Sequence, residues 1–471
     1  MTHNIRTETD SLGTIEIPAD RYWGPQTERA RALFRIGEGR LDPAVIRATG
    51  LQKWAAAEAN RRLGELPEAL AGPIKAAAEE IIAGLRDEDF PLPVWQTGSG
   101  TQTNMNANEV IANRANEMLG QPLGARAPVH PNDHVNLGQS SNDSFPTVMH
   151  LAAVRVLREA LLLGLAALHA ALTAKAAEYA GIVKLGRTHL MDAVPVTLGG
   201  EFATWARQVE NGIARVADAL PRLLLLPQGG TAAGTGLNRH PEFDEVFCAL
   251  VAERTGEAFA PNPDKSEGMA AHDAFVELHG ALNTVAVSLT KIANDIRLLG
   301  SGPRGGIGEL LIPADGLSSS IMRGKTNPTQ CEALTMVAAR VMGNHTTVTF
   351  AGAQGHLELN VFKPVIIQSV LESARLLGDA ARSFATHMVA KLEPNRARIA
   401  EQVAKSLMLV TALNPRIGYD KAVAVAKLAL AEDLTLKEAA ARLGLVTPEE
   451  FDRWVRPEEM VRPGGRLGGA G

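Results

Sequence analysis

The sequence predicts a mainly α-helical protein built around long helices. Five stretches carry apolar residues at three-and-four spacing, the period of a helix, and several exceed 25 residues. Aromatic residues make up only 4% of the 471 residues, and abundant alanine and leucine favour helices over sheets. Convincing strands with alternating apolar residues are scarce. The five stretches are Phe145–Tyr179, Glu201–Leu225, Ser266–Leu299, Pro328–Ala353 and Pro364–Leu392.

Three regions follow one another along the chain. Gly and Pro interrupt residues 1–139 often, which leaves short helical segments such as Pro43–Leu63 and Ile74–Leu85. The long periodic stretches occupy residues 140–395, and helices of this length are typical of a bundle. Residues 396–471 return to shorter helices and predict a small helical C-terminal domain. Because the apolar stripes are wide and small residues recur along them, we expect the bundle helices to pack between subunits of an oligomer.

The composition excludes several function classes. A net charge of −5 leaves no basic face for nucleic acid or an anionic membrane. The two cysteines, Cys248 and Cys331, are too few for a disulfide framework. The N-terminus is polar, unlike a secretory or transit signal, and no apolar run reaches the length of a membrane span. These features predict a cytoplasmic protein with neither a nucleic-acid nor a membrane partner.

The stretch SSSIMRGKTNP, residues 318–328, resembles the end of a phosphate-binding P-loop but departs from it. The P-loop template requires glycine where this chain has Ser319, and a buried strand before the loop. The preceding GELLIPADGLS supplies only a few apolar residues. A second glycine pattern, GSGPRG at residues 300–305, follows a predicted helix instead of a strand. Neither stretch therefore predicts a nucleotide site.

The same stretch has the chemistry of a helix start. Asn327 can cap a helix, Pro328 suits its first position, and Gln330 can complete a capping box. The ammonium of Lys325 would then lie beside the positive end of a helix, an arrangement that favours a carboxylate. Alternatively, Asn327 is only a cap and Lys325 is only solvated.

Other stretches bring small polar side chains between glycines or before helices. Each alone is more often a turn or a helix cap than a ligand site. They are TGSGTQTNMNANEV (97–110), HPNDHVNLGQSSNDS (130–144) and KLGRTHLMDAVPVTLGGE (184–201).

Together with KTNPTQCEALTMVAARVMGN (325–344), these segments resemble the fumarase/aspartase superfamily, and its class II fumarase branch most closely. The similarity runs nearly end to end and includes GGTAAGTGLN (229–238) and VTALNPRIGYDKAVAVAKLA (410–429). It implies a three-domain fold whose central long-helix bundle forms the core of a homotetramer, with active sites shared between subunits. It implies no cofactor and no metal, and a small dicarboxylate as substrate.

The resemblance also implies a reaction, the reversible hydration of fumarate to L-malate. Ser319 would take the C3 proton, and Lys325 and Asn327 would hold the carboxylate that gathers charge in the resulting aci-carboxylate intermediate. A serine needs strong local activation for this role. Thr188 and His189 would bind and activate the water or hydroxyl.

Further residues are implied on the same basis. Glu332 would pair with His189, since a carboxylate orients an imidazole and raises its basicity. The remaining substrate contacts would be hydrogen bonds to carboxylates from Ser99, Thr101, Ser140, Ser141 and Asn142. The turn holding His130, Asn132 and Asp133 resembles the second anion site of the family.

Departures from the family pattern cluster around the Ser319 loop. Ser318 and Arg323 stand where glycine and proline are usual, and Met191 and Gly200 replace common glutamines. Substrate choice therefore stays open between fumarate and another substituted succinate, as for an aspartate ammonia-lyase. A non-catalytic scaffold is a third hypothesis.

Overall fold

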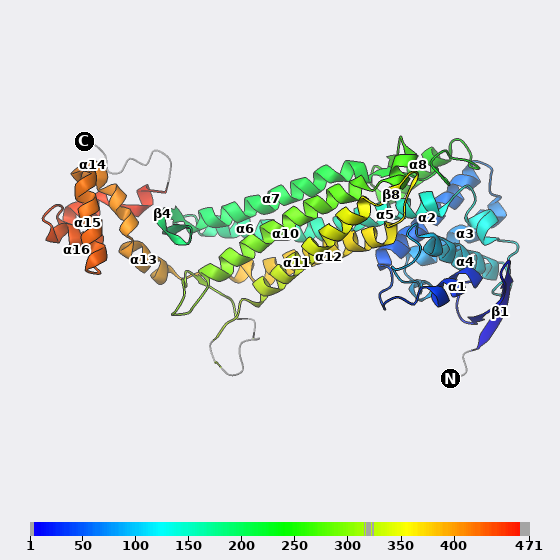
Figure 1. The fold of residues 1–471 in the computed structure, drawn as a ribbon, viewed down its shortest axis with the longest axis horizontal. Coiled ribbons are helices and arrows are strands. Elements are labelled where there is room, and N and C mark those ends of the chain that lie inside the picture. The colour runs from blue at the N-terminus through cyan, green and yellow to red at the C-terminus, as the bar shows by residue number, and fades with distance from the viewer. Residues whose placement is uncertain (1–3, 315, 317–321, 323–324, 462–471) are drawn as a thin grey trace. The chain divides into compact units, whose positions relative to one another are not determined.

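The computed structural model describes residues 4–314, 316, 322 and 325–461, and most of them are helical (Figure 1). This confirms the predicted fold class. The long periodic stretches form long helices as expected, with boundaries shifted by a few residues. These helices are α5 Ser141–Val156, α6 Leu162–Glu178, α7 Leu198–Leu223, α10 Asp273–Leu299, α11 Thr329–Gly352 and α12 Lys363–His387.

Two of the predicted long helices are interrupted. A π-helical turn, Leu157–Leu161, joins α5 to α6 within the stretch expected as one helix. The stretch from Ser266 is split into α9, Lys265–Ala270, and α10. At that break Ala271 is extended, and the carbonyl of Met269 accepts a hydrogen bond from Lys363 Nζ at 2.9 Å. A distant lysine thus takes a carbonyl that the continuing helix would have used.

Shorter helices precede and follow the long ones along the sequence. On the N-terminal side are α1 Pro25–Leu33, α2 Pro43–Arg62, α3 Glu68–Ile82 and α4 Thr101–Met118, with α8 Phe243–Thr255 inserted later. On the C-terminal side are α13 Arg396–Lys405, α14 Asn414–Ile417, α15 Tyr419–Ala431, α16 Leu436–Arg442 and α17 Pro448–Trp454. The C-terminal helices enclose their own apolar cluster, which includes Leu409, Leu413 and Val425.

The strands that the structure describes pair only two by two. The longest pairs are antiparallel: β1 Ile5–Asp10 with β2 Gly13–Pro18, and β3 Val183–Thr188 with β4 Met191–Thr197. Two-residue strands make the others. These are β5 Leu225–Leu226 with β6 Ala260–Pro261, β7 Leu310–Leu311 with β10 Glu393–Pro394, and β8 Gly355–His356 with β9 Leu359–Asn360.

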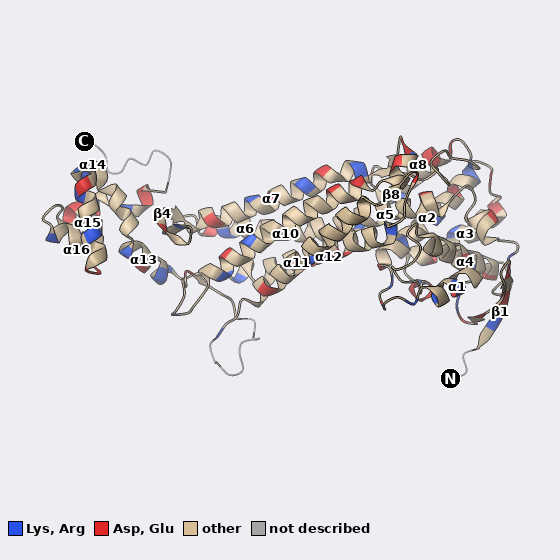
Figure 2. Cartoon of the chain, in the orientation of Figure 1, with Lys and Arg blue, Asp and Glu red and all other residues tan. Residues whose placement is uncertain are grey.

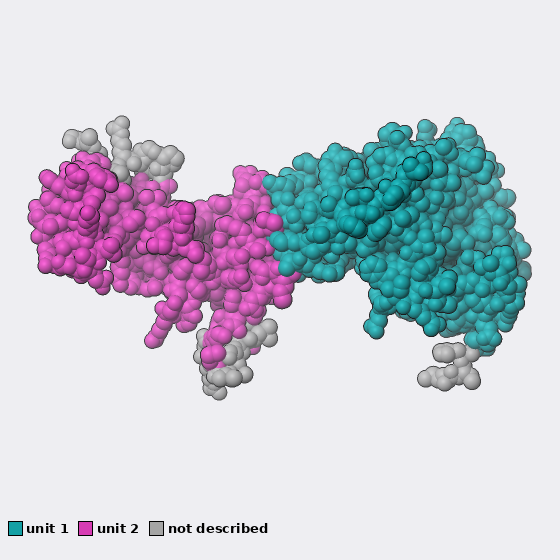
Figure 3. Space-filling model, viewed as in Figure 1, with its two compact units in different colours: residues 1–163, 212–286, 337–379 teal, residues 164–211, 287–336, 380–471 magenta. Residues whose placement is uncertain are grey.

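The chain forms two compact units (Figure 3). Unit 1 comprises residues 1–163, 212–286 and 337–379, and unit 2 comprises residues 164–211, 287–336 and 380–471. Each unit therefore collects segments that are distant in sequence. The predicted division into domains at 139/140 and 395/396 stays a prediction.

Acidic and basic residues are interspersed along the described helices (Figure 2). This distribution agrees with the small net charge of −5. Among the described helices, none has both the length and the apolar character needed to cross a bilayer.

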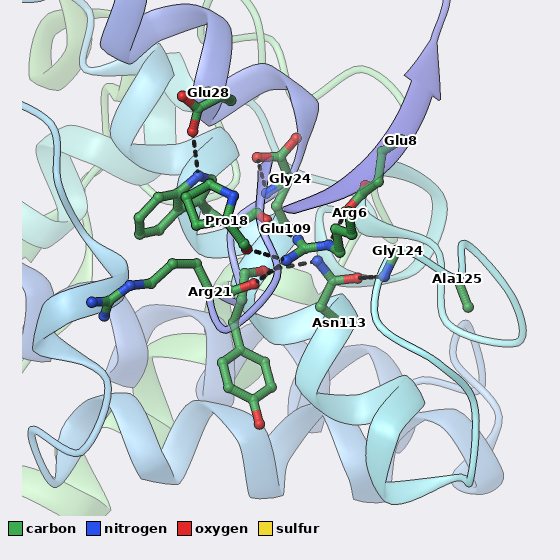
Figure 4. A network of polar contacts seen from close by, with 12 residues as sticks. Arg6, Glu8, Pro18, Arg21, Gly24, Glu28, Glu109, Asn113, Gly124 and Ala125 are labelled. Carbon is green, nitrogen blue, oxygen red and sulfur yellow. Dashed lines mark hydrogen bonds and ion pairs between the residues drawn. The ribbon is translucent and has the colours of Figure 1, made fainter. Parts of the chain in front are cut away.

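A buried carboxylate fixes the N-terminal segment onto α4 in unit 1. Glu109 of α4 is 4% exposed and accepts a hydrogen bond from the backbone nitrogen of Gly24 at 2.9 Å (Figure 4). The backbone nitrogens of Gln26 and Thr27 also donate to it, at 2.8 and 3.1 Å. The Thr27 hydroxyl also donates to it, at 2.6 Å. Glu109 therefore caps the start of α1 from another helix. Burial raises the pKa of Glu109, and the four donors oppose that rise by stabilising the charged form.

Arg6 of β1 extends this network into the preceding loop. Its guanidinium donates to the carbonyl oxygens of Pro18, Arg21 and Trp23 at 2.6–2.8 Å (Figure 4). The loop leading to α1 is thus held from both sides by charged groups.

We expect Glu109→Gln to lower the free energy of unfolding by about 3 kcal/mol, because an amide cannot accept from all four buried donors. The matched control is Glu28→Gln, which changes a carboxylate that is 20% exposed and bound to Trp23 and Arg31. Denaturant unfolding followed by circular dichroism measures both variants. Equal free energies of unfolding in the Glu109 variant and the control would show that the buried carboxylate stabilises the fold no more than the partly exposed one.

Candidate active site

A chain of hydroxyl groups connects the starts of two helices in unit 1. Ser99 Oγ lies 2.7 Å from Thr101 Oγ1, which lies 2.8 Å from Ser141 Oγ. Thr101 begins α4 and Ser141 begins α5. The two helix starts approach because Gly100, in the left-handed region at φ 74°, leaves space that the Phe145 ring fills. Three of the predicted substrate-binding residues therefore lie together.

The start of α5 is closed by a capping box. The Ser140 hydroxyl accepts from Asn142 N at 3.2 Å, and Asp143 Oδ1 accepts from Ser140 N at 2.9 Å. Asn142 Nδ2 donates to Ala232 O at 2.9 Å. All three predicted residues of this segment thus lie at the positive end of a helix, a place suited to an anion.

The Asp143 carboxylate ties this helix start to the loop after β5. Its Oδ2 accepts from Gly229 N at 3.0 Å, Thr231 N at 2.9 Å and Gln228 Nε2 at 3.2 Å. The loop needs such support, because Thr231 has a positive φ of 55° without being glycine. Burial raises the pKa of Asp143 to about 6, while the backbone donors and Lys53 oppose the rise.

A layer of buried polar side chains lies next to Asp143. Lys53 of α2 is fully buried and donates to Asn136 Oδ1 at 3.1 Å and Gln139 Oε1 at 2.9 Å. Gln52 Nε2 donates to the same Gln139 oxygen and to Gln228 Oε1. Burial lowers the pKa of Lys53 to about 7, opposed by the charge of Asp143. This layer connects α2 to both loops that hold the candidate hydrogen-bond donors.

The predicted second anion site forms one tight turn in unit 1. His130 precedes a single π-helical turn, Pro131–Val135, and its Nδ1 accepts from the backbone nitrogens of Asn132 at 3.3 Å and Asp133 at 3.2 Å. The ring also lies 3.2 Å from Asp133 Oδ2. Burial lowers the pKa of His130, which suits an imidazole nitrogen that accepts. The three predicted residues therefore lie together and contact one another.

The Thr188–His189 pair lies at the tip of the β3–β4 hairpin in unit 2. Thr188 ends β3, and His189 and Leu190 form the turn with φ of 57° and 63°. Both Thr188 and His189 are exposed. Two consecutive non-glycine residues in the left-handed region are uncommon, and such strain is concentrated at functional sites.

Lys325 and Asn327 precede α11 in unit 2, as predicted. The backbone nitrogens of Cys331 and Glu332 bond to Pro328 O, so the helix begins at Thr329, one residue later than expected. Gln330 accepts from Ser383 Oγ at 2.8 Å, so it packs against α12 instead of completing the expected capping box. Lys325 and Glu332 are exposed, and Asn327 is partly exposed.

The remaining predicted residues divide into two cases. Ser319, with its neighbours Ser318 and Arg323, lies outside the described residues. The pair of His189 and Glu332 is not made within the described part of one chain, where neither side chain has a hydrogen bond or ion pair. The described acidic, His and Cys residues contain no group of three able to hold a metal ion.

The supporting residues were missed in the sequence. Asp143 carried a usable signal, because Ser140-x-x-Asp143 before an apolar run has the spacing of a capping box. Its second partner, the loop at Gly229, lies 86 residues away and had no local signal. Lys53 lies in the middle of an alanine-rich helix and resembles a solvated residue by its spacing alone.

Comparison with known proteins matches almost the whole chain. A family of lyases matches residues 13–343, and the fumarase C C-terminus family matches residues 409–462. Fumarate hydratase class II 2 of Bradyrhizobium diazoefficiens is 58% identical over 98% of this chain and 97% of its own length. Mitochondrial fumarate hydratase of Schizosaccharomyces pombe is 57% identical over 97% of this chain and 88% of its own.

Solved structures show the same fold. The class II fumarase from Schistosoma mansoni superimposes with a TM-score of 0.94 at 42% identity, covering 98% of this chain and all of that one. The 3-carboxy-cis,cis-muconate lactonizing enzyme from Pseudomonas putida shares the fold at a TM-score of 0.70 and 22% identity.

We expect Asp143→Asn to raise the KM for the dicarboxylate substrate by about tenfold with a smaller effect on kcat, because the Ser140–Asn142 corner loses its tie to the Gly229 loop. Steady-state kinetics of the purified variant measure both constants. Glu159→Gln, which changes an exposed carboxylate paired with Arg155, is the control. An unchanged KM in the folded Asp143 variant would contradict the positioning role.

Proposed function

The chain belongs to the class II fumarate hydratase family, and we propose that it catalyses the reversible hydration of fumarate to L-malate, a reaction of the tricarboxylic acid cycle. The observation that carries this proposal is the 58% identity to a class II fumarate hydratase over 98% of the chain. The lyase family match at residues 13–343 includes every segment that holds a candidate site residue.

The difficult step is removal of a proton from C3 of malate. The carbon acid is weak, and its carboxylate must take additional negative charge as the aci-carboxylate forms. Fixed donors aimed at that charge are typically the largest catalytic contribution. We assign this task to Lys325 and Asn327, supplemented by the positive end of α11, which begins at Thr329. Their position just before the helix supports the assignment.

Proton transfer at C3 and at the hydroxyl is assigned to opposite sides of the substrate. Ser319, outside the described residues, is the proposed base at C3. His189, with Thr188, is the proposed group that takes a proton from water in hydration and returns it in dehydration. Glu332 is the proposed partner that orients the imidazole.

The second substrate carboxylate is assigned to the hydroxyl chain in unit 1. A carboxylate accepts several hydrogen bonds, and this corner offers donors at two helix starts. They come from Ser99, Thr101, Ser140, Ser141 and Asn142. The turn of His130, Asn132 and Asp133 is proposed as a separate, second anion site.

We also propose that the chain works as a homotetramer whose active sites are shared between subunits. The described part of α11 supports association, because it exposes large apolar residues: Met336 is 68% exposed and Phe350 62%. Phe350 lines an apolar groove of about 590 Å³ in unit 1, together with Trp95 and Val361. A surface of this kind is stable in water only when covered.

The purified protein should form fumarate from L-malate and give no product from aspartate or argininosuccinate. Fumarate absorbs in the ultraviolet, so one absorbance assay compares the three substrates under identical conditions. Conversion of aspartate but not malate would overturn the proposed function in favour of an ammonia-lyase. Inactivity with all three would favour a different substituted succinate or a scaffold.

Ser319→Ala should lower kcat by about a hundredfold or more, the contribution expected of a general base. The oligomeric state by size-exclusion chromatography should stay that of the wild type. Ser301→Ala, at a serine that donates to Leu298 O, is a control for a serine change elsewhere in unit 2. Turnover close to wild type in Ser319→Ala would remove this residue from the base role.

A further inference from the structure

Strand β3 reaches the Thr188–His189 turn through an irregularity at Gly186. Leu185 lies opposite Pro195, while Arg187 lies opposite Asp192, so the register shifts between them. A Cβ atom on Gly186 would lie 2.5 Å from Val194 O, which only glycine avoids. A bulge of this kind interrupts the alternation of side chains along a strand and redirects those that follow.

The bulge brings two cations of one strand to one buried carboxylate. Residues 184 and 187 would point to opposite faces of a regular strand. Here Lys184 Nζ lies 3.0 Å from Glu309 Oε2, and Arg187 Nη1 donates to Glu309 Oε1 at 2.9 Å. The Glu309 side chain is fully buried, and the Lys184 side chain is 1% exposed. Such a carboxylate tolerates little displacement of its partners.

The C-terminal segment completes the contacts of Arg187. Its Nη2 donates to Gln402 Oε1 of α13 at 3.0 Å, and Gln402 Nε2 donates to Ile307 O at 2.8 Å. Asn395 N donates to Glu309 O at 2.8 Å. Both ends of the guanidinium are therefore fixed: Nη1 by Glu309, just before β7, and Nη2 by Gln402 of α13, which follows β10.

The hairpin tip needs this support. His189 and Leu190 are both in the left-handed region, which residues with a side chain disfavour. Both are exposed, so packing at the tip does little to hold their conformation. Among the described residues of β3, the one nearest to His189 whose side chain has a hydrogen bond or ion pair is Arg187, two residues before it.

We propose that Glu309 is a positioning residue for His189, acting through Arg187 across the Gly186 bulge. The proposal rests on the role assigned to His189 in the proposed function. In it, the buried ion pair sets the direction in which the strained turn presents the imidazole. Gln402 assists by fixing the second arm of Arg187, which connects the C-terminal segment to the site.

Glu201 provides a matched control, because it belongs to the same ionic cluster without contacting Arg187. Its Oε1 accepts from Lys184 Nζ at 2.7 Å, and its side chain is 26% exposed. Glu309→Gln and Glu201→Gln thus each remove one carboxylate charge from Lys184. Only the first leaves Arg187 without its anion.

Kinetics of fumarate hydration should separate the two variants. Glu309→Gln should lower kcat by about ten- to a hundredfold, because a small misplacement of a catalytic group is costly. Glu201→Gln should stay within about threefold of wild type, since partly exposed ion pairs contribute little. Glu309→Asp, which keeps the charge, should recover part of the loss. Equal losses in the Glu309→Gln and Glu201→Gln variants would overturn the positioning role.

The pH profile gives a readout that a purely structural role would not move. Glu309→Gln leaves the charge of Arg187 uncompensated near His189, which favours the neutral imidazole. The acid limb of kcat/KM for hydration, where the base must be unprotonated, should therefore move to lower pH. An acid limb at the same pH in Glu309→Gln and wild type would contradict the proposal. The hairpin carries Lys184, Arg187 and Asp192, and the adjoining α7, α10 and β7 segments add Glu201, Lys291, Asp295 and Glu309. Helix α13, which packs against β3, adds Arg396, Arg398, Glu401 and Lys405.

Hydrogen exchange tests the positioning without any substrate. Amides of residues 186–194 should exchange faster in Glu309→Gln than in Glu201→Gln or wild type. Unchanged exchange in folded protein would overturn the proposal, whereas a wild type inactive on fumarate would overturn only the proposed function. If Glu309→Gln fails to fold, Gln402→Ala provides the test: faster exchange of the same amides supports the proposal, and wild-type exchange contradicts it.

Discussion

The candidate site in unit 1 depends on one buried carboxylate that is fully hydrogen-bonded. Asp143 binds the start of its own helix and the loop at Gly229, so it sets the positions of Ser140, Ser141 and Asn142 relative to that loop. An ionised group away from water is tolerated only when donors surround it. The same requirement makes the arrangement rigid, since moving either loop would leave the charge unsatisfied. The groups proposed to bind the substrate carboxylate are thus held in place by a buried carboxylate of the protein, Asp143.

The same physical device recurs at two other places. Glu109 fixes the start of α1 through three backbone nitrogens, and Glu309 fixes a bulged strand through two cations. At Glu109 the backbone nitrogens of a helix start have no partner within their own helix, whereas at Glu309 the partners are the Lys184 and Arg187 side chains of the bulged strand. A carboxylate accepts from several directions, so it suits such segments better than an amide or hydroxyl. The helices of this protein supply a frame, and buried acids attach the irregular segments that carry chemistry.

Local patterns predicted what depends on neighbours in sequence. The long helices and the start of α11 followed from periodicity and capping chemistry, and the resemblance identified the family. The break between α9 and α10 could not be predicted, because Lys363 competes for the Met269 carbonyl from far along the chain. The β3–β4 hairpin was missed for a related reason: its bulge at Gly186 removes the alternation that marks a strand. Supporting residues such as Lys53 and Glu309 are defined only by tertiary partners, so no local pattern distinguishes them from solvated charges.

A contrast in burial connects catalysis to assembly. The supporting groups Asp143 and Glu309 are buried within one chain, whereas the proposed reactive groups His189, Lys325 and Glu332 are exposed. A reactive group must keep hydrogen-bonding positions free for the substrate, so a single chain cannot bury it without leaving a charge unsatisfied. Yet donors stabilise a developing charge most strongly when water is excluded. The two requirements are compatible if water is excluded only when a partner subunit and the substrate cover these groups. The carboxylates of the substrate then pair with the cations. On that argument, the proposed oligomer is part of the active site instead of a way to stabilise separate sites.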